Sequence, residues 1–201
     1  MLPITLNSNQ VRIVVFGYGK ASQTKIQGIA RSGMRCHVVS PSIEEASVYE
    51  NITLECASYT PDQLSKGQLV IAATDSEALN AQIMLDAHAA GKLVLNLSNG
   101  DKSDFHMMSW RRKGPVTLGM STGNCAPKES VRLIESLIDV VDDETVCRIQ
   151  YLGALRKKIK QLGIRPVKPL INKMTAFTVE ELARLEALPL EELALEIKKD
   201  M

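Results

Sequence analysis

Two glycines near the start of the chain, Gly17 and Gly19, are the residues best suited to chemistry. They lie in the sequence VRIVVFGYGKAS, Val11–Ser22. A glycine turn between a strand and a helix exposes backbone amides that can bind phosphate groups. Gly17 permits the turn, and Gly19 lets the backbone approach a phosphate without a Cβ in the way. Ser22 takes the third place of the G-x-G-x-x-G pattern, where a small side chain still allows close packing. The stretch predicts a dinucleotide pyrophosphate site.

A second polar segment, residues 98–105, carries two carboxylates, Asp101 and Asp104. In a nucleotide-dependent oxidoreductase, a carboxylate beside the nicotinamide can accept a proton while a hydride leaves. Asn-Gly and Asp are also common in turns, so a solvated turn is the alternative interpretation. His106 follows this segment and is the histidine that we expect to have a function.

The acidic residue that usually holds the ribose in such folds is missing from its expected place, about 20 residues after the glycines. The strand predicted there ends in Ser40-Pro41-Ser42, and Glu44 and Glu45 follow only later. Either hydroxyl and backbone groups hold the ribose, or the glycine turn binds another ligand. The pattern leaves both open.

Strands and helices alternate through the first half of the chain, which predicts an α/β fold with a Rossmann-like, doubly wound parallel sheet. Strands are expected at Val11–Phe16, Arg35–Ser40, Ile52–Cys56, Leu69–Ala73 and Val94–Leu97. Helices are expected at Ser22–Arg31 and Glu77–Ala90, with a helical turn at Pro61–Leu64. The loops after the strands then meet at one edge of the sheet. They are Gly17–Ser22, Ser40–Ser42, Thr74–Asp75 and Leu97–Asp104.

The second half of the chain has a different character. We expect a basic turn at Arg111–Gly114, a strand at Val116–Met120, a helix from Pro127, a helix over Val146–Leu162, a linker at Ile164–Leu170, and helices opened by Thr178 and Pro189. The predicted organisation is a nucleotide-binding domain over 1–112, a small dimerisation region over 113–142 and a helical C-terminal domain over 143–201.

The composition limits which binding partners and which cellular compartment we expect for this protein. The net charge of +1 over 201 residues gives no reason to expect nucleic acid or an acidic membrane as a partner. No apolar run is long enough to span a bilayer. The first residues lack the features of a signal peptide, and the four cysteines are scattered, so we expect a cytoplasmic protein with reduced thiols. No spacing of His, Cys and carboxylates predicts a metal site.

As a whole the chain resembles the precorrin-2 dehydrogenase family, which also forms the NAD-dependent domain at the start of siroheme synthases. The resemblance covers residues 1–140. The matching segments, in order, are Met1–Ile4, Val15–Ala21 with Lys25, Val38–Pro41, Ile71–Asp75 with Leu79 and Asn80, Asn96, Phe105, Gly114, and Ser121–Gly123 followed by Pro127.

This resemblance implies a homodimer that oxidises precorrin-2 to sirohydrochlorin with NAD, on the way to siroheme or cobalamin. Some members also insert iron or cobalt, and the sequence leaves a ferrochelatase activity open. The implied cofactor-binding residues are Gly17, Tyr18, Gly19, Lys20 and Ala21 at the pyrophosphate, Ser40, Pro41 and Ser42 at the adenosine ribose, and Thr74 beside the cofactor. Thr122 and His106 are expected near the tetrapyrrole, and dimerisation is expected through Val116–Val141.

The sequence departs from the family pattern near the expected catalytic position. The family's catalytic aspartate lies three residues after Asn96, where this chain has Asn99. Because asparagine cannot accept a proton at neutral pH, Asp101 in the same turn becomes the expected proton acceptor, with Asp104 as the alternative. Asn124 and Ala126 also replace a glycine and a serine of the family. A catalytically impaired carrier or regulator that binds NAD(H) or a tetrapyrrole therefore stays open as a second function. The charged C-terminal helices leave a third function open, a pure interaction module.

Overall fold

The computed structural model describes residues 2–43, 49–123 and 125–199, and the side chain of Lys199 is excluded. Glu44, Glu45 and Asn124 therefore lie outside the described residues. The chain forms two compact units, Met1–Met107 and Met108–Met201. The predicted boundary at residue 112 falls inside a strand of the second unit.

The first unit is built on a five-stranded parallel sheet with the order β3-β2-β1-β4-β5. Its strands are β1 (Arg12–Phe16), β2 (Arg35–Ser40), β3 (Ile52–Cys56), β4 (Leu69–Ala72) and β5 (Leu93–Asn96). The strand order reverses direction beside β1, so the topological switch point lies between the carboxyl ends of β1 and β4. The predicted α/β, doubly wound sheet is confirmed.

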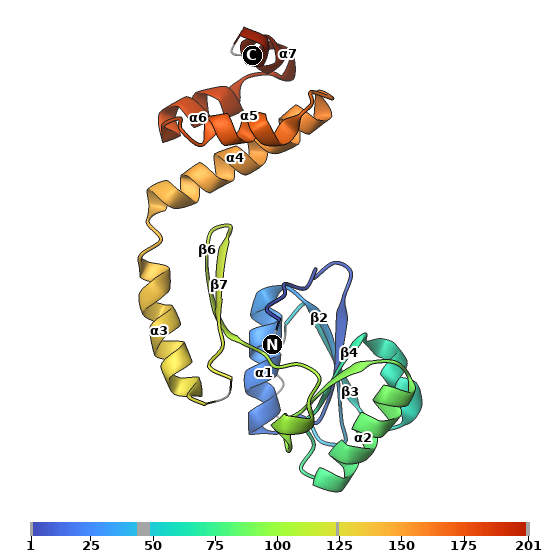
Figure 1. Cartoon of the computed structure of the whole chain (residues 1–201). Helices are drawn as coiled ribbons and strands as arrows, with labels where there is room; N and C mark the ends of the chain where they lie inside the picture. The colour runs from blue at the N-terminus through green and yellow to red at the C-terminus, as the bar shows by residue number, and fades with distance from the viewer. Residues whose placement is uncertain (1, 44–48, 124, 200–201) are drawn as a thin grey trace. The chain divides into compact units, whose positions relative to one another are not determined.

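Helices cover both faces of this sheet, as Figure 1 shows for α1 (Lys20–Ser32) and α2 (Glu77–Ala89). Side chains of β1 alternate between the two faces, because successive residues of a strand point to opposite sides. Val15 packs in the cluster that contains Ile29 of α1, and Phe16 packs in the cluster that contains Ile83 of α2. Two short 3-10 helices, η1 (Pro61–Lys66) and η2 (Gly100–Lys102), complete the unit.

The second unit begins with an antiparallel hairpin of β6 (Ser109–Lys113) and β7 (Val116–Met120). The prediction of a basic turn over Arg111–Gly114 is wrong, because Arg111–Lys113 pair with β7 and only Gly114, with φ +54°, lies in the turn. Helix α3 (Pro127–Asp139) begins at its proline as predicted and packs against the hairpin.

Four more helices complete the second unit: α4 (Asp143–Gln161), α5 (Val167–Met174), α6 (Val179–Ala187) and α7 (Leu190–Lys199). Their core contains the fully buried Leu155, Ile159, Leu182 and Leu193. The prediction of a linker over Ile164–Leu170 is wrong in its second half. Pro169 falls in the first turn of α5, where a missing N–H removes no helical hydrogen bond.

Candidate cofactor and catalytic site

Gly17 makes the bend that follows β1. Its φ is +107°, and a Cβ at this position would lie 2.2 Å from the carbonyl oxygen of Ala73. Its amide donates to the carbonyl of Val39 at 2.8 Å. Gly17 is therefore required by the fold itself, and it shapes the turn without offering a free N–H to a ligand.

Gly19 has a different role at the start of α1. It is the N-cap residue, no side chain caps the helix, and no acid lies in the first turn. The first amides of a helix have no partner within it, so this end is suited to an anion. A Cβ on Gly19 would approach only Asp75 Oδ1, at 3.5 Å. The packing of the chain itself therefore does not require glycine at this position. Lys20 and Ala21, which follow it, are exposed.

Two neighbours of the glycine turn face the protein interior. Ser22 is fully buried, and its hydroxyl donates to the carbonyl of Gly19 at 2.8 Å, which agrees with a small residue in the third position of the motif. Tyr18 is half-buried against the apolar cluster on the α1 side, and its carbonyl accepts from Gln23 Nε2 at 3.2 Å. Any contact of Tyr18 with a cofactor would therefore be made by its exposed edge or its backbone.

The Ser40–Ser42 segment ends β2 at the same edge of the sheet. Ser40 is buried, and its hydroxyl donates to the carbonyl of Ser42 at 2.9 Å. Pro41 and Ser42 are exposed. The hydroxyl that this segment offers to solvent is therefore that of Ser42, while Ser40 shapes the turn.

Thr74 follows β4 and is held by a side chain of α2. Asn80 is fully buried, and its Oδ1 accepts from the amide of Thr74 at 2.9 Å and from its hydroxyl at 2.7 Å. Asn80 Nδ2 donates to the carbonyl of Thr74 at 2.9 Å and to Ser98 Oγ at 2.5 Å. One amide group thus joins the turn after β4 to the loop after β5.

The loop after β5 is anchored at both of its ends. At its start, Asn96 is buried and its Oδ1 accepts from the amides of Ser98 and Asn99, at 2.9 and 3.3 Å. At its end, Ser103 Oγ accepts from the amide of Asn96 at 2.9 Å, and the amide of Asp104 donates to the carbonyl of Val94 at 2.8 Å. The loop therefore returns along the open edge of β5.

Asp104 holds the end of this loop against β5 and α2. Its Oδ2 accepts from the amide of Val94 and lies 2.8 Å from His88 Nε2. Partial burial works to raise the pKa of Asp104, but the hydrogen bonds from Val94 and His88 outweigh it and hold the pKa below its usual value. Its carboxylate is thus committed to the sheet edge and is not presented to a substrate.

The tip of the loop, Asn99–Lys102, carries Asp101. This residue lies in η2, and its carboxylate is exposed and forms no hydrogen bond or ion pair with the described residues. Asn99 is exposed as well, and its carbonyl accepts from the amide of Lys102 at 3.3 Å. At this tip Asp101 is the carboxylate left open for proton transfer.

The two residues expected near the tetrapyrrole lie in different units. His106 is half-buried between Phe105 and Met107, which pack against the apolar cluster on the α1 side. Thr122 belongs to the second unit, where its hydroxyl accepts from the amide of Ala126 at 3.2 Å and lies 3.0 Å from Ser130 Oγ. Thr122 thus caps the start of α3, and its contact with a substrate stays a prediction.

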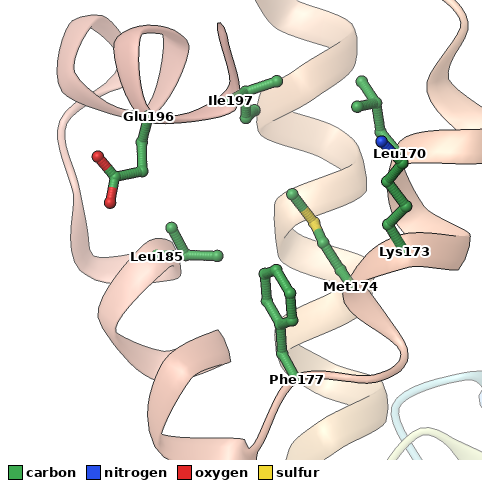
Figure 2. Close-up of a pocket in the computed structure, with 7 residues that line it drawn as sticks. All are labelled: Leu170, Lys173, Met174, Phe177, Leu185, Glu196 and Ile197. Atoms are coloured by element: carbon green, nitrogen blue, oxygen red, sulfur yellow. The ribbon is translucent and has the colours of Figure 1, made fainter. Parts of the chain in front are cut away.

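The helices of the second unit surround a small apolar cavity. Figure 2 shows Met174, Phe177 and Leu185 pointing toward one another where α5, α6 and α7 meet. The apolar cavity there holds about 40 Å³, enough for a few water molecules and far less than cofactor pockets occupy. Across the described ranges, no group of three or more His, Cys, Asp or Glu side chains could hold a metal ion. No described helix is long and apolar enough to cross a membrane.

Comparison with known proteins identifies the family. Residues 4–109 match the protein family described as "Putative NAD(P)-binding". The chain is 31% identical over 168 residues to a siroheme synthase of Nitrosomonas europaea, covering 80% of this chain and 35% of the relative. It is 25% identical over 162 residues to a precorrin-2 dehydrogenase of Bacillus subtilis, covering 79% of this chain and 99% of the relative. The chain thus spans about a third of the length of the siroheme synthases that it matches.

A solved structure has the same fold. The chain of "SirC, precorrin-2 dehydrogenase" superposes with a TM-score of 0.68 at 19% identity, covering 99% of this chain and all of that one. The resemblance that the motifs predicted is therefore confirmed, and the chain belongs to the NAD(P)-binding family that residues 4–109 match.

Proposed function

We propose that this protein is an NAD-dependent precorrin-2 dehydrogenase, which oxidises precorrin-2 to sirohydrochlorin. The observation that carries the proposal is the juxtaposition at one sheet edge of an uncapped helix N-terminus and an anchored loop that presents Asp101. The similarity to a siroheme synthase and to a precorrin-2 dehydrogenase supports a tetrapyrrole as the substrate.

The residues present fit the pyrophosphate of a dinucleotide. The amides at the start of α1 have no capping side chain. The space beside Gly19 is open, because the nearest atom to a Cβ built on Gly19 is Asp75 Oδ1, at 3.5 Å. Lys20 adds a positive charge at the same point. On this proposal the exposed Ser42 hydroxyl contacts the adenosine ribose in place of the missing acid, and Thr74 flanks the cofactor.

Asp101 is the proposed proton acceptor. Oxidation of precorrin-2 removes a hydride and a proton, and bound NAD supplies the hydride acceptor. The exposed Asp101 carboxylate takes the proton, because Asp104 is engaged by Val94 and His88 and Asn99 has no basic group. His106 and Thr122 are proposed to contact the tetrapyrrole.

The test is a precorrin-2 oxidation assay with purified protein and NAD, followed by NADH absorbance and by the spectrum of sirohydrochlorin. We expect NAD-dependent formation of both products. Binding of NAD by calorimetry with no turnover would instead support the carrier or regulator, and absence of NAD binding would support the interaction module. A parallel reaction with sirohydrochlorin and Fe²⁺ tests whether the protein also has ferrochelatase activity.

We further propose that the protein is a homodimer that uses the second unit. Helix α3 exposes Val131, Leu133 and Leu137, at 39, 44 and 48%, and Val140 just after it is 78% exposed. Apolar side chains clustered on one short helix are typical of an interface. Light scattering at micromolar concentration should give twice the chain mass, and Leu137→Glu should give the monomer. No nucleic acid or membrane partner is proposed, and the proposed location is the cytoplasm.

A further inference from the structure

The loop that carries Asp101 is joined to the cofactor-binding turns by a continuous set of contacts within the first unit. Gly17 lies against the Ala73–Thr74 peptide, since a Cβ on Gly17 would be 2.9 Å from the amide nitrogen of Thr74. Thr74 is bonded to Asn80 by its amide, its hydroxyl and its carbonyl. Asn80 then reaches Ser98, the second residue of the loop after β5.

Asn80 is saturated by these contacts. Its two donor hydrogens and both acceptor positions are used, and its side chain is fully buried. Three of the four bonds hold the Thr74 turn, and their loss would leave the half-buried amide and carbonyl of Thr74 without these partners. Only the fourth bond, to Ser98 Oγ, leaves the turn and joins it to another loop.

Ser98, in contrast, is exposed, and among the described residues its hydroxyl is bonded to Asn80 alone. Its amide donates to Asn96 Oδ1, a bond that does not depend on the side chain. The loop also keeps its second anchor at Ser103 and Asp104. Removing the Ser98 hydroxyl should therefore leave the fold intact. It breaks the one side-chain link that the described residues form between the turn at Thr74 and the tip with Asp101.

We propose that Asn80 and Ser98 are positioning residues that couple the occupied cofactor site to the catalytic tip, Asn99–Lys102. This inference rests on the proposed function. When the cofactor lies against the turns at Gly17 and Thr74, the Asn80–Ser98 bond holds the tip at a fixed distance from it. Neither residue contacts the reacting atoms.

The coupling can be measured without turnover, by hydrogen–deuterium exchange with and without NAD. In the wild-type protein, NAD should slow exchange over residues 17–24 and also over residues 97–104. In Ser98→Ala the protection over 17–24 should persist, and the protection over 97–104 should be lost. Ser98→Thr keeps the hydroxyl and should restore it. Ser65→Ala removes another exposed hydroxyl with one local bond, to the carbonyl of Asp62, and serves as the control.

Kinetics give a second readout that a merely structural role would not produce. Ser98→Ala should lower kcat about tenfold, because small misplacement of a catalytic group is costly, while the Kd for NAD changes less than twofold. Absence of NAD protection over 17–24 in the wild-type protein overturns the proposed function and this inference with it. If NAD protects residues 17–24 in the wild-type protein, but its effect on residues 97–104 is the same in wild type and in Ser98→Ala, this inference alone is overturned. Equal losses of NAD affinity and kcat in Ser98→Ala also overturn it.

Discussion

The Cα of Gly17 faces the carbonyl oxygen of Ala73 so closely that a Cβ on Gly17 would lie 2.2 Å from that oxygen. The two residues directly follow the neighbouring parallel strands β1 and β4, and the amide of Ala73 donates to the carbonyl of Phe16 at 2.8 Å. The first glycine of the motif is thus a condition for pairing β1 with β4. The second glycine has no such neighbour.

Alanine substitutions should separate these two roles. Gly17→Ala should destabilise the protein by at least about 3 kcal/mol, because it adds a positive-φ penalty to a backbone clash. Gly19→Ala should change stability by less than about 1 kcal/mol and raise the Kd for NAD at least tenfold. Urea unfolding and calorimetry measure the two effects. Unimpaired NAD binding by a folded Gly19→Ala protein would contradict the assignment of the phosphate site.

The role of Asp101 can be tested beside the family's usual catalytic position. Asp101→Asn should lower kcat about a hundredfold, the lower end of what a general base contributes, with little change in the Kd for NAD. Asn99→Asp should raise kcat, because it places a carboxylate where the family has one. Asp62→Asn, another exposed carboxylate of the first unit, is the control and should have wild-type activity. Full turnover by Asp101→Asn would remove it from the mechanism.

Asp104 should matter for stability more than for chemistry. Asp104→Ala leaves the amide of Val94 and the ring of His88 without their acceptor, which should cost about 1–3 kcal/mol. Asp101→Ala, in the same loop but without a partner among the described residues, should cost less than about 0.5 kcal/mol. Urea unfolding followed by circular dichroism compares them. Equal stability of the two variants would argue against the anchor.

Acid should weaken the protein partly through Glu55. Hydrogen bonds from Lys66 and then His37 lower the pKa of Glu55 from 4.5 to about 2. Because the folded pKa lies below the unfolded one, this stabilisation is complete above pH 4.5 and is lost as the pH falls from there to about 2. Glu55→Gln should therefore unfold at lower urea than wild type at pH 7, with a difference that shrinks toward pH 2. A difference that is independent of pH would refute the ion pair.

The sequence predicted the strands better than it predicted the site. Apolar runs bounded by turn residues place Arg35–Ser40 and Ile52–Cys56 at their observed ends. Arg111–Lys113 were predicted as part of a turn, yet they pair with β7. Strand preference depends on the neighbouring strand more than on the residue itself, so the cations alone do not reveal the pairing.

Within the site, the glycine turn can be predicted from the sequence, because only glycine fits such a bend. The hydrogen-bond partners of individual polar side chains cannot be predicted in this way. The engagement of Asp104 depends on His88 and Val94, which are 16 and 10 residues away in the sequence. The Ser40 hydroxyl bonds to the carbonyl of Ser42, only two residues on, but the residue types do not reveal that it turns inward. The sequence singles out Asn80 only through the family resemblance. A buried asparagine in the first turn of a helix carries no periodic signal, and its partners Thr74 and Ser98 lie on two different loops.

The double anchoring of the loop after β5 has a consequence for how such a protein can change over generations. The residues that hold the loop, Asn96, Ser103 and Asp104, are separate from the residues at its tip. A single codon change at Asn99 or Asp101 can therefore remove or restore a proton acceptor while the scaffold stays as it is. Descendants of one ancestor can alternate between turning over a ligand and merely holding it, with no intermediate that fails to fold.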